Sequence, residues 1–132
     1  MTKKMVIAVD FDGTLCEYDF PNIGRQKKEH AELLNIIIDL KNDGHKIILY
    51  TCRGDNEEHK CLSEAIEWCA ERGLNFDAVN KNVPGFIKRS GPSPKPVADL
   101  YIDDRALRFA DERTMNSSIV YLKNLLRKNG IK

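Results

Sequence analysis

Two carboxylates, Asp10 and Asp12, follow directly on the short apolar run at residues 5–9. Such a run is typical of a buried strand, and in a parallel α/β sheet ligands bind outside the carboxyl ends of the strands. Because side chains alternate along an extended chain, both carboxylates would enter that crevice while Phe11 turns toward the core. Carboxylates placed in this way can act as nucleophiles, as acid–base groups or as ligands of a hard cation.

Further polar residues stand beside two later apolar runs, at residues 46–50 and 98–102. They are Thr51 and Arg53 after the first run, Lys95 before the second, and Asp103 and Asp104 after it. Taken with the Asp-Phe-Asp-Gly-Thr-Leu string at 10–15, these residues resemble, in kind and in order, the four motifs of the haloacid dehalogenase superfamily of phosphatases. The resemblance spans nearly the whole chain. An ordered set of motifs is far more specific than one aspartate pair after a strand.

The resemblance implies a phosphatase that works through a covalent intermediate. Asp10 would attack phosphorus to form an aspartyl-phosphate, which divides one difficult displacement into two easier ones. Asp12 would protonate the leaving oxygen and then deprotonate the hydrolytic water, while its main-chain carbonyl contacts the metal. Asp103 would complete the metal site, and Asp104 would either join it or bind ordered water. These oxygen ligands suit Mg²⁺, which is therefore the expected cofactor.

Two further residues are implied to hold the phosphoryl group. Thr51 would donate its hydroxyl and a nearby backbone N–H, and Lys95 would supply a compact positive charge. Lys81 and Lys88 lie on the same approach, but Lys95 is preferred because it leads into the last apolar run. Arg53 would bind a second anionic group of the substrate, and the alternative is an arginine that is solvated in a loop.

The spacing of apolar residues predicts alternating strands and helices. It predicts helices over 30–42, 57–71 and 117–129, and strands over 5–9, 46–50, 76–79 and 100–102. This alternation indicates the α/β class: a single Rossmann-like, three-layer domain over residues 1–132, with a parallel sheet covered by helices on both faces. The resemblance adds the strand order, with the fourth strand beside the first, followed by the second and third. Neither place where related phosphatases insert a cap domain has room for one, so a capless member is expected.

The segment 80–96 holds four of the five prolines and is expected to be a loop. One interpretation is a plain connector. The other is a lid that faces the substrate, with Lys95 at its base and the basic pair Lys88 and Arg89 gripping the substrate. A site without a cap would favour bulky substrates, or closure by a second copy of the chain in a homo-oligomer.

The composition narrows the possible functions. Charged residues make up 31% of the 132 residues, but the formal net charge is only +1, so nucleic-acid binding is not indicated. The sequence shows neither the apolar stretch of a signal peptide nor the roughly 20 apolar residues of a membrane span, so a cytoplasmic protein without a membrane partner is expected. The four cysteines lack metal-binding spacing and are expected to be reduced thiols, with Cys61 and Cys69 buried on a helix.

Several functions share these residue types. Receiver domains also phosphorylate an aspartate, but there the acidic pair comes first and the lysine last, whereas here Asp103 and Asp104 follow Lys95. A phosphoryl-binding or non-catalytic regulatory module of the same fold would keep every motif residue. A phosphotransferase would need to exclude water, which the missing cap disfavours. The phosphorylated substrate stays open among nucleotides, sugar phosphates, phosphorylated proteins and nucleic-acid ends.

Overall fold

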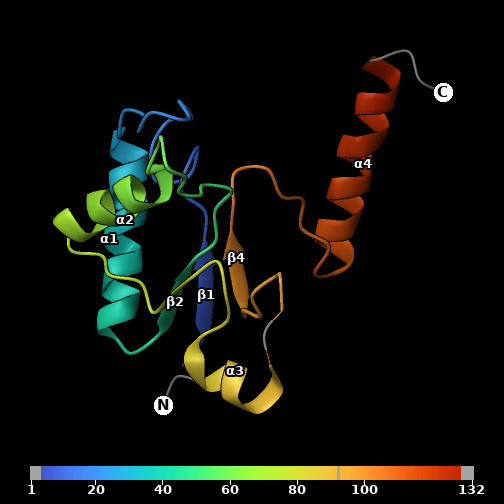
Figure 1. The fold of residues 1–132 in the computed structure, drawn as a ribbon. Coiled ribbons are helices and arrows are strands. Elements are labelled where there is room, and N and C mark those ends of the chain that lie inside the picture. The colour runs from blue at the N-terminus through green and yellow to red at the C-terminus, as the bar shows by residue number, and fades with distance from the viewer. Residues whose placement is uncertain (1–3, 92, 129–132) are drawn as a thin grey trace.

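Four parallel strands form a sheet at the centre of the molecule (Figure 1). The computed structural model describes residues 4–91 and 93–128. The strands are β1 (Val6–Val9), β2 (Lys46–Leu49), β3 (Ala78–Val79) and β4 (Leu100–Ile102), in the order β3-β2-β1-β4. This order confirms the one that the resemblance implies. The fold is the expected single Rossmann-like α/β domain with a parallel sheet.

Two helices, α1 (Lys28–Asn42) and α2 (Cys61–Glu71), cover one face of the sheet. Alternate strand residues, among them Ile7, Val9 and Ile47, point to this face because side chains alternate along a strand. They pack with buried apolar residues of the two helices, which are Leu34, Ile37, Ala65 and Cys69. This layer is the main core, and it holds the strand ends that carry the predicted site residues.

The opposite face of the sheet is covered more thinly. Ala8, Ile48 and Ala78 are buried there, against a few partly buried residues from the chain on either side of α3 (Pro84–Ser90). This helix was not predicted, because the prolines of the segment 80–96 indicated a loop. Pro84 instead occupies the first helical position, where a missing N–H costs nothing, and Gly91 ends the helix with a φ of 81°.

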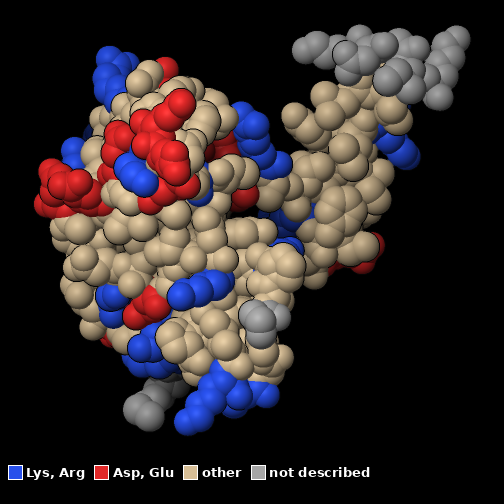
Figure 2. Space-filling view, viewed as in Figure 1, with Lys and Arg blue, Asp and Glu red and all other residues tan. Residues whose placement is uncertain are grey.

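Helix α3 lies at the end of the sheet where the strands begin (Figure 1). Figure 2 shows Lys and Arg side chains over this end of the molecule, where α3 contributes the exposed residues Lys88 and Arg89. Except for Lys95, which precedes β4, the predicted site residues follow the opposite ends of the strands. The interpretation of this segment as a lid that grips the substrate with Lys88 and Arg89 is therefore wrong, and the segment is a connector that contains a short helix.

The C-terminal helix α4 (Glu112–Lys128) extends away from the sheet (Figure 1). It begins earlier than predicted because the Asp111 carboxylate accepts a hydrogen bond from the Thr114 backbone N–H at 2.8 Å and so caps the helix. The predicted end at Asn129 lies outside the described residues. The exposed apolar side chains of α4 include Met115, Ile119, Val120, Tyr121, Leu122 and Leu126. The second face of the sheet is thus left to the chain on either side of α3, at Val83 and Ala98, so the expected helical cover on both faces is met only in part.

Within the described residues, no helix combines the length and the apolar character that a membrane span requires. Cys61 and Cys69 are buried on α2, as predicted, and Cys52 is exposed.

Candidate active site

The register of the sheet brings the first and fourth motifs side by side. Val9 of β1 pairs with Ile102 of β4, and the backbone N–H of Asp10 donates to the Ile102 carbonyl at 2.9 Å. Asp103 follows at the neighbouring position. On the other side of β1, strand β2 ends at the same level, which brings Thr51 to this edge. The carboxyl ends of three strands therefore gather the predicted residues, as expected for a parallel sheet.

Asp10, Asp103 and Asp104 form an acidic cluster at this edge. One carboxylate oxygen from each lies within 4.8 Å of the others. Gly13 makes room for the cluster, because its φ is +81° and a Cβ at this position would lie 2.1 Å from Oδ2 of Asp104. Three carboxylate oxygens are the donors that Mg²⁺ and Ca²⁺ prefer, so the residues fit the expected ion. The carbonyl contact of Asp12 with the metal stays a prediction.

Burial is the largest cause of a raised pKa at Asp10, which is about 7 against an ordinary value of 3.8. The negative charges of Asp103 and Asp104, with a hydrogen bond to Asp104, raise this pKa further, while a hydrogen bond from the Phe11 backbone lowers it in part. Near neutral pH, the cluster therefore holds a proton easily. A divalent cation would offset the repulsion among the carboxylates and favour the ionised form of Asp10.

Arg53 is buried and holds the side chain of Asp12. Its Nε and Nη2 atoms donate to the two carboxylate oxygens of Asp12, each at 2.8 Å. Its other hydrogen bonds run to the main-chain carbonyls of Pro21, Asn22 and Cys61. These contacts use all five N–H groups of a guanidinium. The expectation that Arg53 binds the substrate is wrong, and so is the alternative of a solvated arginine, because the side chain is 0% exposed and has no donor left.

The pair of Arg53 and Asp12 is charge-assisted. Burial alone would lower the pKa of Arg53, but the hydrogen bonds and the charge of Asp12 raise it above its usual value, so the guanidinium stays charged. The Asp12 carboxylate is held outside the acidic cluster, although Asp10 is only two residues away. The two carboxylates at the end of β1 thus have different surroundings, which allows them different chemical roles.

Asn80 positions Thr51. Its side-chain oxygen accepts a hydrogen bond from the Thr51 backbone N–H at 2.8 Å, so this N–H is not available to a phosphoryl group. Thr51 Oγ1 accepts the backbone N–H of Arg53 at 3.2 Å. Because a hydroxyl both accepts and donates, the Thr51 proton is still available to an anion in the site. The hydroxyl contact predicted for Thr51 fits this geometry, whereas a contact through its own N–H does not.

A cavity of about 440 Å³ joins most of the predicted residues and is called the acidic cavity below. Its walls include Asp10, Asp12, Thr51, Asp103 and Asp104. The rest of the wall consists of three aromatic residues, a thiol and an arginine, which are Tyr18, Phe20, Tyr50, Cys52 and Arg105. The structure thus gathers the first, second and fourth motifs around one space.

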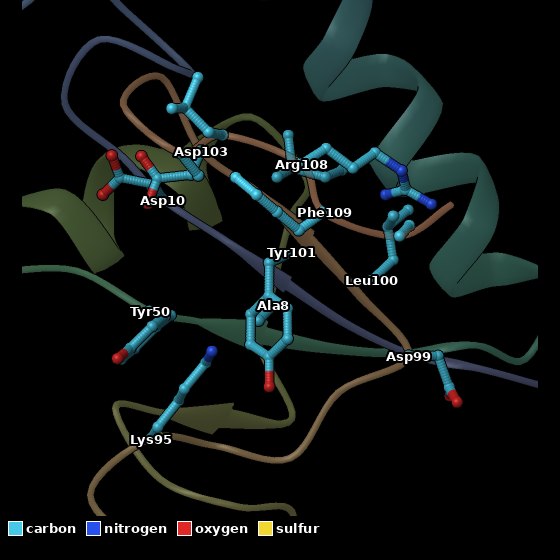
Figure 3. A pocket seen from close by; sticks show the side chains of 14 residues that line it. Ala8, Asp10, Tyr50, Lys95, Asp99, Leu100, Tyr101, Asp103, Arg108 and Phe109 are labelled. Atoms are coloured by element: carbon cyan, nitrogen blue, oxygen red, sulfur yellow. The ribbon is translucent and has the colours of Figure 1, made fainter. Parts of the chain in front are cut away.

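Lys95 lines a second cavity of about 670 Å³, on the thinly covered face of the sheet (Figure 3). Asp10 and Asp103 border both cavities. Figure 3 shows these two residues at one end of the second cavity and Lys95 at the other, where the Lys95 ammonium lies 4.7 Å from the centroid of the Tyr101 ring. Lys95 therefore shares a cavity with Asp10 but points at an aromatic ring, and its contact with a phosphoryl group stays a prediction.

Two polar residues at this edge, Asn80 and Arg53, have roles that the sequence pattern does not predict. Asn80 directly follows β3, so its place after a predicted strand could have indicated it, and its φ of 53° suits asparagine better than most residues. For Arg53 the sequence predicts a contact with the substrate, whereas in the structure its side chain holds Asp12. Nothing in its neighbours along the chain signals that a loop arginine will be buried against carbonyls far away in sequence.

No model of a protein family matches the sequence, and the search of curated proteins also found no match. A solved structure from Bacteroides thetaiotaomicron, described as that of a conserved protein, is 39% identical in sequence and superposes with a TM-score of 0.64. The match covers 92% of this chain and 93% of that chain.

Proposed function

The chain belongs to the same family as the conserved protein from Bacteroides thetaiotaomicron, and from the site itself we propose that it is a magnesium-dependent phosphomonoester hydrolase that forms an aspartyl-phosphate. The observation that carries the proposal is the acidic cluster of Asp10, Asp103 and Asp104, which shares one cavity with Asp12 and Thr51. Such a set combines a nucleophile, cation ligands, a proton carrier and a hydroxyl donor. The resemblance of the four motifs supports the same reaction.

Asp10 is the nucleophile in this proposal. Its carboxylate oxygen attacks phosphorus, the bond from phosphorus to the leaving oxygen breaks, and water later releases phosphate from the aspartyl-phosphate. Asp103 and Asp104, together with Asp10, would hold Mg²⁺. When bound, the ion supplies positive charge that offsets the repulsion between the anionic substrate and the carboxylates. The hydroxyl of Thr51 donates to a phosphoryl oxygen, and Lys95 contributes a positive charge from the neighbouring cavity.

Asp12 carries protons in this proposal. As an acid it gives a proton to the leaving oxygen, and as a base it takes one from the attacking water. The two hydrogen bonds from Arg53 stabilise the ionised carboxylate, which is the form that accepts the proton of water. For the acid step the contact with Arg53 has to weaken.

The same contact favours a second candidate function, a phosphoryl-binding regulatory module. If Arg53 keeps Asp12 from moving protons, the aspartyl-phosphate on Asp10 would persist instead of being hydrolysed. The two functions differ in stoichiometry. A phosphatase releases many equivalents of phosphate per chain, whereas a module retains one phosphoryl group that mass spectrometry of acid-quenched protein would find on Asp10.

Four cysteines, none of them in a disulfide, support a reducing, cytoplasmic location as part of the proposal. This part is independent of the reaction. Fractionation of the source cells, with detection of the protein by antibody, would test it, and recovery outside the cytoplasm would contradict it.

The test of the proposed reaction is phosphate release from an aryl phosphate with Mg²⁺, compared among the wild type, Asp10→Asn and the wild type with chelator. We expect release only from the wild type with Mg²⁺. Asp39→Asn, an exposed substitution on α1, is the matched control and should keep full activity. Calorimetric titration with Mg²⁺ gives a second readout, because Asp103→Asn should weaken binding and Asp39→Asn should not. Release that is equal in Asp10→Asn and the wild type would refute the proposal.

A further inference from the structure

Two aromatic side chains stand exposed at the acidic cavity. Tyr18 is 55% exposed and Phe20 is 45% exposed, and both line the cavity that holds Asp10 and Thr51. Single exposed aromatic residues are common on protein surfaces and need no explanation. Here two of them converge, from one short loop, on a cavity that already holds a set of reactive groups. Tyr50, at the end of β2, adds a third ring to the same wall.

The loop that carries Tyr18 and Phe20 is fixed by contacts with the rest of the protein. Arg53 donates to the carbonyls of Pro21 and Asn22, directly after Phe20. A close approach also fixes the loop, because a Cβ at Gly24 would lie 1.9 Å from the carbonyl oxygen of Glu17. The rings therefore project from an ordered segment, and ordered aromatic side chains give binding energy at low entropic cost.

A guanidinium group stacks on each of these rings. The Arg105 guanidinium carbon lies 4.7 Å from the centroid of Tyr18, and that of Arg53 lies 5.3 Å from the centroid of Phe20. Each ring thus has a cation over one face, and both side chains keep a large exposed area at the cavity. Arg105 is itself exposed and lies 3.8 Å from Asp104, so a positive group stands between the rings and the acidic cluster.

The size of the cavity indicates how large the ligand is. About 440 Å³ falls within the range of roughly 300–1,000 Å³ that is typical of sites for small molecules. A phosphoryl group and one small ring leave part of this space empty. A phosphate, a sugar and a flat base together suit both the volume and the lining of the cavity, which holds carboxylates and aromatic rings.

We propose that the acidic cavity takes a nucleoside monophosphate, with the phosphate at Asp10 and Thr51 and the base stacked on Tyr18 and Phe20. This inference rests on the proposed function, because it names the substrate class of the same site. Stacking recognises the flat face that all bases share, so it predicts preference for nucleotides over aliphatic phosphates with little choice among bases.

The experiment compares adenosine 5′-monophosphate with ribose 5-phosphate, which has the same sugar and phosphate but no base. We expect kcat/KM of the wild type to be roughly 10-fold or more higher for the nucleotide, as is typical of one stacked base. Tyr18→Ala and Phe20→Ala should each reduce this ratio toward 1. Tyr121→Ala is the matched control, because Tyr121 is also 55% exposed but lies on α4, and it should leave the ratio unchanged.

Equilibrium binding separates this inference from the proposed reaction. If ribose 5-phosphate and the nucleotide are hydrolysed equally well, the reaction stands and the inference is overturned. If neither is hydrolysed, yet calorimetry with Mg²⁺ shows that adenosine 5′-monophosphate binds more tightly than ribose 5-phosphate and that Tyr18→Ala removes the difference, the inference stands and the reaction fails. A phosphotyrosine peptide with a higher kcat/KM than any nucleotide would also overturn the inference.

Discussion

Arg53 and Asp12 meet in a two-point ion pair at 2.8 Å, 41 positions apart in the sequence. The pair joins the turn after β1 to the loop after β2, and the remaining donors of Arg53 extend it to the segment at Pro21 and to the start of α2. One buried guanidinium thus connects Asp12, the loop that carries Tyr18 and Phe20, and the start of α2. Its role is to position these parts.

We predict that Arg53→Met lowers the free energy of unfolding by about 3–5 kcal/mol, because it leaves the Asp12 carboxylate poorly solvated and unpaired. Urea denaturation followed by circular dichroism would measure the change. Asp12→Asn with Arg53→Met should cost less than the sum of the single substitutions, since the double variant removes both charges. Arg105→Met is the matched control: its side chain is 71% exposed, so the change should stay within about 0.5 kcal/mol. A similar loss at both arginines would contradict the prediction.

Gly13 is expected to be intolerant of any side chain. Gly13→Ala places a methyl group 2.1 Å from Oδ2 of Asp104 and adds the cost of a positive φ, which is of order 1–2 kcal/mol. We expect both a lower melting temperature and weaker Mg²⁺ binding. Gly91→Ala is the control, because Gly91 has the same φ of 81° but open space around the added atom. It should lose stability and keep its affinity for Mg²⁺. Equal affinity in the two variants would show that Asp104 is not a ligand.

The four cysteines should differ strongly in reactivity. Cys52 is exposed, whereas Cys16, Cys61 and Cys69 are buried, and burial raises the pKa of Cys69 to about 12. Because the thiolate is the reactive form, iodoacetamide at pH 8 should modify Cys52 quickly and the other three only after unfolding. Peptide mass spectrometry at successive times would establish the order. Rapid labelling of Cys69 in the folded protein would mean that α2 opens readily.

The strands of the sheet could be predicted because each of them is marked by residues that are neighbours in the sequence. Short apolar runs marked each strand. The strand order that the structure confirms was implied only by the resemblance to the haloacid dehalogenase superfamily. Errors occurred where distant side chains determine a boundary. Helix α2 begins at Cys61 and not near residue 57, because the Asp55 carboxylate accepts hydrogen bonds from the backbones of Leu62 and Ser63 and holds the intervening chain as a loop.

The candidate site was predictable in its residues but not in their contacts. Asp10, Asp103 and Thr51 come together because each follows a strand, and parallel strands end at one edge. The pairing of Arg53 with Asp12 and the reach of Asn80 to Thr51 depend on the tertiary fold, so the spacing of residues contains no sign of them. Helix α4 shows the opposite case, since its sequence pattern predicted an apolar face correctly but could not tell where that face would lie.

The raised pKa of Asp10 predicts a dependence of stability on pH in the metal-free protein. The folded protein binds a proton at Asp10 with a pKa of about 7, whereas the ordinary value is 3.8. Asp10 therefore contributes stability that is fully present below pH 3.8 and is lost as the pH rises through 7. With chelator present, Asp10→Asn should have a higher melting temperature than the wild type at pH 8, and the difference should shrink toward pH 4. Mg²⁺ should stabilise the wild type more than the variant at pH 8, because it binds the ionised cluster. A difference in melting temperature that does not change between pH 4 and pH 8 would mean that Asp10 titrates normally in the metal-free protein, which would contradict the prediction.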